Sequence, residues 1–176
     1  QSHPWQGAVH EVITPNGNLL YSDVAICHRK LGAGDPDRNL NIYRKLLAEG
    51  RILSAREQYY YSRELYYHQL YDDAIEAFGV FLSLPDGWME DKIEACIMLT
   101  GKSDEALLML FRSLLYDIPR AEVCCEIGDC FMKTGRFETA AFWFETALDC
   151  QMDYRKGGFI LPDCYDYIPA IQLCVC

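Results

Sequence analysis

Two spacings of apolar residues divide the chain into a strand-like beginning and a helical remainder. In residues 1–34, β-branched and aromatic side chains flank Asn16 and Gly17, a dipeptide typical of a β-hairpin turn. From residue 35 onward, apolar residues recur at helical intervals, and the first helix is expected to end at Gly50. One face of that helix carries its apolar side chains, Leu40, Tyr43, Leu46 and Leu47. We therefore predict a small β-hairpin segment followed by a helical domain over residues 35–176.

The helical segments recur in pairs. A small residue opens the second helix of each pair at Ala74, Ala106 and Ala140, which are 32 and 34 residues apart, close to the tetratricopeptide (TPR) period. The third pair carries the other residues typical of this repeat: Gly128, Phe131, Gly135, Phe144 and Ala147. Antiparallel helices approach closely where facing side chains are small, so we expect Gly128 to lie against Ala140. The predicted fold class is mainly α, a TPR-like antiparallel helix-hairpin solenoid.

Charge and composition exclude several kinds of protein. The chain has 26 acidic and 16 basic residues, a net charge of −10, which argues against binding to nucleic acid or to an anionic membrane. The sequence shows neither a membrane-spanning apolar run nor a signal peptide. Nine cysteines without a compact disulfide spacing fit a reducing compartment. We therefore expect a cytoplasmic protein without structural disulfides.

Several strings along the chain resemble, in order and separation, one known family. They are WQGAVHE and ICH near the start, then RNLNIYRKLLAEG, AREQYYYSREL, PRAEVCCEIGD, FWFETALD and IPAIQLCVC. The combination resembles the family 2 glycosyltransferases of Gram-positive and related bacteria that carry TPR repeats behind the catalytic domain. Residues 1–34 resemble the β-hairpin tail of that catalytic domain, and residues 35–176 resemble its helical C-terminal region.

The resemblance implies a parent enzyme that transfers sugar from a nucleotide-sugar donor, using a Rossmann-like domain and an Asp-x-Asp site for Mn or Mg. This chain has no nucleotide-binding half. The one literal match is Asp35-Pro36-Asp37, in which Asp35 suits a helix N-cap and Pro36 the first turn. We therefore expect a C-terminal fragment that binds no cofactor and is inactive alone. The alternative is a free-standing TPR adaptor for protein–protein interaction, with no enzymatic role.

Three residues are candidates for parts of the parent's active site. The resemblance places His10 and Glu11 on its acceptor side, where a carboxylate could act as general base and an imidazole could bind the metal. His28 is a second possible metal ligand. The alternative interpretation is a strand-end histidine beside a solvated glutamate. Adjacent residues on a strand point to opposite faces, so we do not expect His10 and Glu11 to act together.

A tyrosine-rich segment is the best candidate for binding a partner. If Ser62 is the small position of its helix, one set of side chains projects toward the concave groove: Arg56, Tyr59, Arg63, Tyr66 and Tyr67. Arginine and tyrosine are good interface anchors, whereas Tyr60 and Tyr61 are expected to pack between helices. The partner could be an acceptor peptide or protein, or the missing catalytic domain.

Two further features concern the helical domain. Adjacent Cys124 and Cys125, five residues before Cys130, lack the spacing of a zinc site and are interpreted as helix-packing thiols.

The last helix, expected to start at Pro169, stops without a polar capping helix, so the chain looks truncated. Apolar surface near Leu173 and Val175 is then expected to support a homodimer.

Overall fold

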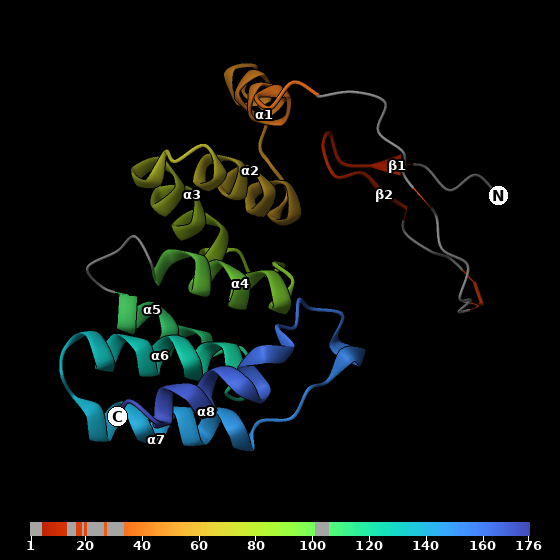
Figure 1. Cartoon of the computed structure of the whole chain (residues 1–176). Coiled ribbons are helices and arrows are strands. Elements are labelled where there is room, and N and C mark those ends of the chain that lie inside the picture. The colour runs from red at the N-terminus through yellow and green to blue at the C-terminus, as the bar shows by residue number, and fades with distance from the viewer. Residues whose placement is uncertain (1–4, 14–16, 19, 21–26, 28–33, 101–105) are drawn as a thin grey trace. The chain divides into compact units, whose positions relative to one another are not determined.

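The computed structural model of the protein describes residues 5–13, 17–18, 20, 27, 34–100 and 106–176. This part of the chain is mainly helical and contains eight α-helices and one two-stranded sheet (Figure 1). It forms two compact units, Gln1–Ala77 and Phe78–Cys176. The mainly α fold class is thus confirmed, whereas the repeat solenoid and the boundary after residue 34 stay predictions.

The two strands near the N-terminus are shorter than predicted. Strand β1 (Trp5–Gln6) pairs antiparallel with β2 (Val12–Ile13). Residues 7–11, which the sequence predicts as strand, form the connecting turn, because Gly7 and His10 adopt φ angles of +96° and +54°, a conformation that interrupts an extended strand. The predicted turn at Asn16 and Gly17 lies largely outside the described residues.

Two helices of the first unit follow the apolar pattern closely. Helix α1 (Arg38–Ala48) buries Leu40 and Tyr43 and ends before Gly50, whose φ of +79° is the left-handed conformation expected there. The predicted start was wrong by two residues, because the N-cap is Asp37. Asp35 instead accepts a hydrogen bond from the Asp37 backbone N–H at 2.9 Å, which closes the turn before the helix.

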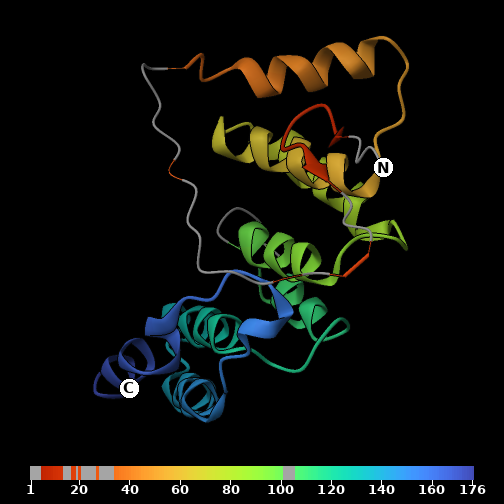
Figure 2. The same ribbon diagram turned by 90° about the vertical axis from the view of Figure 1, so that its right-hand side faces the viewer.

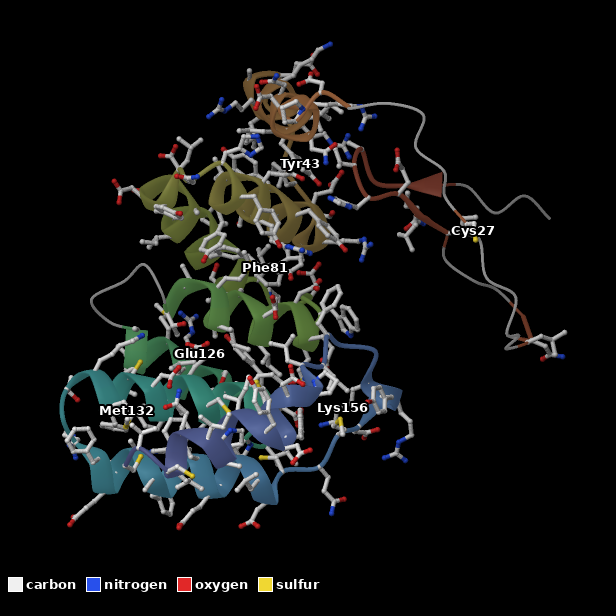
Figure 3. The ribbon with its side chains drawn as sticks, in the orientation of Figure 1. Cys27, Tyr43, Phe81, Glu126, Met132 and Lys156 are labelled. Carbon is white, nitrogen blue, oxygen red and sulfur yellow. The ribbon has the colours of Figure 1, made fainter. Side chains whose placement is uncertain are left out.

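Helix α2 (Ala55–Tyr67) begins at a capping box formed by Ser54 and Glu57. A small core forms around Tyr43 of α1 (Figure 3). Val9 and Leu53 complete this cluster, and Tyr60 and Tyr61 pack against it as predicted. Helix α3 (Tyr71–Ser83) contains the boundary between the two units.

The second unit consists of packed helices and two 3₁₀ turns. Its helices are α4 (Met89–Thr100), α5 (Ala106–Ser113), α6 (Ala121–Lys133), α7 (Phe137–Asp149) and α8 (Tyr167–Leu173). Helices α6 and α7 lie side by side and antiparallel, and α8 packs on α7 (Figures 1 and 2). Between α7 and α8 the chain forms η1 (Tyr154–Lys156) and η2 (Pro162–Tyr165).

The contact that brings α6 close to α7 differs from the predicted one. Gly128 lies against the ring of Phe144, and a Cβ added to Gly128 would come within 2.6 Å of that ring. Ala140 is buried, but it is not the side chain nearest to Gly128. A flat aromatic ring fills the space above the glycine more completely than a methyl group would.

The C-terminal helix agrees only in part with its prediction. Helix α8 begins at Tyr167, so the buried Pro169 lies in its first turn. Leu173 packs against the core of the second unit, while Val175 is 63% exposed. Of the two residues predicted for a dimer contact, only Val175 is therefore well exposed. Among the described helices, none has the length and apolar character needed to cross a lipid bilayer.

Candidate partner-binding surface and pocket

The two candidate active-site residues near the N-terminus, His10 and Glu11, have different surroundings. His10 lies in the turn between β1 and β2 and stacks on the Tyr60 ring at 4.2 Å between centroids. Its Nε2 atom lies 3.6 Å from Oε1 of Glu64, whereas Glu11 is exposed. The structure thus joins His10 to helix α2 and not to Glu11. His28 lies outside the described residues.

Arg63 is held among tyrosine rings on α2. Its guanidinium carbon lies 5.4 Å from the Tyr59 centroid, 5.7 Å from that of Tyr60 and 5.4 Å from that of Tyr67. One Nη2–H also donates to the Tyr67 hydroxyl at 2.9 Å. Such cation–π contacts restrict a side chain that would otherwise sample many rotamers. A partner that meets Arg63 therefore meets a guanidinium already fixed in place.

Arg56 extends the same surface by one helical turn. Its guanidinium lies 4.8 Å from the Tyr60 centroid, and its Nη2–H donates to the His10 carbonyl at 3.4 Å. We name the residues Arg56, Tyr60, Arg63 and Tyr67 the α2 surface. Tyr67 is 60% exposed and gives this surface an accessible aromatic edge.

Two residues of the predicted groove, Tyr59 and Tyr66, are less exposed than Tyr67. Tyr59 is only 1% exposed, so its predicted place on the groove surface was wrong. It points inward because it shares the buried side of α2 with Ser62 and Leu65. Tyr66 is half-buried and makes edge-on contacts with the rings of Tyr67 and Tyr71. Both tyrosines therefore support the α2 surface from beneath or beside it.

The local charge of the first two helices is positive although the whole chain is acidic. Residues 38–67 contain six Lys or Arg and three Glu, a net charge of +3, whereas residues 78–176 carry a net charge of −8. The α2 surface lies in this basic segment. Its chemistry suits an acidic or aromatic group of a partner.

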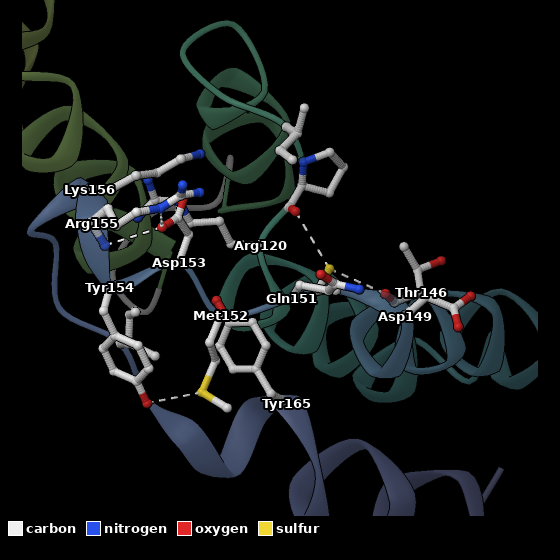
Figure 4. Close-up of a pocket in the computed structure, with 14 residues that line it drawn as sticks. Arg120, Thr146, Asp149, Gln151, Met152, Asp153, Tyr154, Arg155, Lys156 and Tyr165 are labelled. Atoms are coloured by element: carbon white, nitrogen blue, oxygen red, sulfur yellow. Dashed lines mark hydrogen bonds and ion pairs between the residues drawn. The ribbon is translucent and has the colours of Figure 1, made fainter.

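The second unit contains a pocket of about 870 Å³ (Figure 4). Its wall is formed by the turn before α6, by the end of α7 and by the segment that follows α7. Arg120, Cys150, Met152, Tyr154 and Tyr165 are among the side chains that line it. The Tyr154 hydroxyl donates to Sδ of Met152 at 3.3 Å, so part of the lining is already tied together.

Arg120 is the centre of an ion network beside this pocket. It donates two hydrogen bonds to Glu90, both of 2.6 Å, and one of 2.9 Å to Asp117. Lys156 reaches Asp117 from η1 at 2.6 Å. Burial raises the pKa of Asp117, but the hydrogen bonds from Lys156 and Arg120 outweigh it and hold that pKa below its usual value.

The same region fixes the segment between η1 and η2. The Glu122 carboxylate accepts hydrogen bonds of 2.9 Å from the Leu161 backbone N–H and from the Tyr165 hydroxyl. Gly158 lies so close to Glu90 that any Cβ would overlap the carboxylate. The segment between η1 and η2 therefore contacts two buried carboxylates, those of Glu90 and Glu122. The sequence does not predict this network, because its members are up to 43 residues apart and none stands in a short motif.

The adjacent cysteines Cys124 and Cys125 pack in the core of the second unit, as predicted. Cys124, Cys125 and Cys164 are buried in one cluster with Ala121 and Ala147. Within the described ranges, no group of three or more His, Cys, Asp or Glu side chains is arranged to hold a metal ion.

Comparisons of the chain with protein-family models, curated proteins and solved structures gave no match.

Proposed function

We propose that this chain is an interaction region of a family 2 glycosyltransferase, whose helices bind a partner or acceptor. Sugar transfer would belong to a catalytic domain outside this sequence. The ordered strings that resemble that family support the first part of the proposal. The close packing of α6 on α7 across the short link of residues 134–136 supports the second part, because arrays of such helix hairpins present extended surfaces to ligands.

The single observation that carries the binding role is the Arg63 arrangement on α2. A guanidinium fixed above three tyrosine rings, next to the exposed Tyr67, loses little conformational entropy when it pairs with a carboxylate. The net charge of +3 over residues 38–67 attracts the same kind of group. We therefore propose an acidic peptide segment as the ligand of the α2 surface.

The binding role can be tested with a fluorescein-labelled poly-glutamate peptide and fluorescence anisotropy. Arg63→Ala and Tyr67→Ala should each weaken binding by about tenfold, the loss expected for one charge-assisted anchor. Lys45→Ala removes the same charge from an exposed position on α1. It should change the dissociation constant less than twofold, because salt screens the attraction of a single exposed charge. Equal losses in all three variants, or no binding by the wild type, would contradict the proposal.

The glycosyltransferase assignment is tested separately, by reading the gene upstream of the codon for Gln1. An in-frame domain with an Asp-x-Asp motif after an apolar strand would support it. A frame that starts near Gln1 would indicate a free-standing adaptor. Calorimetry with a UDP-sugar and Mn²⁺ should show no binding by this chain, and micromolar binding would overturn the assignment of the donor site to another domain.

A further inference from the structure

Four thiols gather where α6 begins and α7 ends. Cys124 and Cys125 lie in the first turns of α6, Cys150 caps the C-terminal end of α7, and Cys164 lies in η2. Cys124, Cys125 and Cys164 share one buried cluster, and Cys150 packs against it. The antiparallel arrangement explains this, because the first residues of one helix in a hairpin lie beside the last residues of the other.

Cys150 is the member of this group that faces the pocket. It is partly buried and lines the pocket wall. Its Sγ atom lies 3.3 Å from the Thr146 carbonyl and 3.5 Å from the Pro119 carbonyl, and one thiol hydrogen can serve only one of these acceptors at a time. Cys150 is therefore the thiol of this group that lies at the surface of the pocket.

Cys124 lies behind Cys150 and has no exposed surface. Cys150 packs against the buried cluster that contains Cys124. The interaction with the Cys150 thiol, followed by burial, raises the pKa of Cys124. The same interaction lowers the pKa of Cys150, against the opposing effects of burial, Glu122 and Asp149. Cys150 thus lines the pocket, and Cys124 is enclosed in the cluster against which Cys150 packs.

We propose that Cys150 and Cys124 form a peroxide-reactive thiol pair that closes to a disulfide. The Cys150 thiolate attacks one oxygen of hydrogen peroxide, the O–O bond breaks, and hydroxide leaves and takes up the thiol proton as water. Cys150 is then a sulfenic acid. The Cys124 sulfur attacks the Cys150 sulfur, the S–O bond breaks, and the departing hydroxide takes the Cys124 proton. Two thiols lose two electrons, and one peroxide becomes two waters.

The neighbouring thiols, Cys125 and Cys164, are not placed to react with peroxide in the pocket. Cys125 and Cys164 are also close, with Cys125 Sγ 3.6 Å from the Cys164 carbonyl oxygen. Both side chains are buried, however, and neither lines the described pocket. An oxidant that enters the pocket therefore meets Cys150 first. The new bond would join the start of α6 to the end of α7, and a cellular thiol reductant would reverse it.

Peptide mass spectrometry tests the proposal directly. The folded chain is treated with hydrogen peroxide, its remaining thiols are blocked with N-ethylmaleimide, and it is digested with trypsin without reductant. Cys150 is the sole cysteine of residues 137–155, so a peptide containing 121–133 joined to 137–155 identifies its partner helix. We expect this cross-linked peptide, and an intact protein about 2 Da lighter than the reduced form.

Variants separate the proposed pair from the alternatives. Cys150→Ser and Cys124→Ala should each abolish the cross-linked peptide, whereas Cys125→Ser and Cys164→Ser should retain it. If Cys124→Ala does not fold, fragmentation of the wild-type cross-linked peptide still shows which cysteine of residues 121–133 is bonded. A bond to Cys125 or Cys130, oxidation confined to the exposed Cys174 and Cys176, or no loss of thiols would overturn the proposal.

Discussion

Gly128 shows how much one missing side-chain atom matters in this fold. The Phe144 ring occupies the place of its Cβ, so Gly128→Ala must displace a fully buried ring. We expect a loss of about 1–3 kcal/mol in the free energy of unfolding, measured by urea denaturation.

Gly79 provides the matched control for that substitution. It lies within α3, is exposed, and has open space around its Cβ position. Gly79→Ala should stabilise the protein by about 0.5–1 kcal/mol through helix propensity alone. Destabilisation by both variants would show that the loss at Gly128 does not come from the Phe144 contact.

The tyrosines of α2 show what residue type alone leaves undecided. The sequence predicted packing for Tyr60 and Tyr61, and this is confirmed. It placed Tyr59 on the surface, and this was wrong, since Tyr59 is buried with Ser62 and Leu65. Neighbouring tyrosines have the same hydropathy, so only the rotation of the helix against its core separates an inward ring from an outward one.

Between elements, a histidine joins the end of α2 to the start of α1. Nδ1 of His68 lies 2.7 Å from the Glu64 carbonyl oxygen, and Nε2 lies 3.1 Å from Oδ1 of Asp37. The hydrogen bond to the Glu64 carbonyl and the nearby Asp37 carboxylate raise the pKa of His68 above its usual 6.5. The stabilisation from this pair is therefore fully present below pH 6.5 and is lost as pH rises through the folded pKa.

Asp37→Asn should lower the pKa of His68, as measured by an NMR titration of its imidazole signals. The stability advantage of the wild type over this variant should then be largest below pH 6.5 and decline at higher pH. Asp35→Asn changes a neighbouring carboxylate that does not contact His68 and should leave the His68 titration nearly unchanged. An unaltered pKa in Asp37→Asn would mean that the ion pair does not form in solution.

Across the second unit, the Arg120 network holds elements that are distant in sequence. Arg120→Met would leave Glu90, whose side chain is 4% exposed, without its guanidinium partner. We expect a loss of about 3–5 kcal/mol in the free energy of unfolding, because a buried charge would remain unpaired. Urea denaturation followed by circular dichroism provides the measurement.

The control for this prediction is the exposed pair of Arg155 and Asp153. Arg155 is 90% exposed, so Arg155→Met should leave the denaturation midpoint within experimental error of the wild type. A similar midpoint for both variants would show that Glu90 is neutral or hydrated when Arg120 is absent. A double variant, Arg120→Met with Glu90→Gln, should recover part of the lost stability because it removes the unpaired charge.

The sequence by itself determined the helical character from residue 35 onward, the end of α1 near Gly50, and the apolar positions of α6 and α7. These depend on local periodicity and on backbone preferences, which short stretches of sequence carry. Only the tertiary structure decided that Phe144 covers Gly128, that Arg120 pairs with Glu90, and that Cys150 packs against the cluster that contains Cys124. These contacts join residues 16 to 30 positions apart, and their geometry is set by how whole helices pack, which no local pattern records.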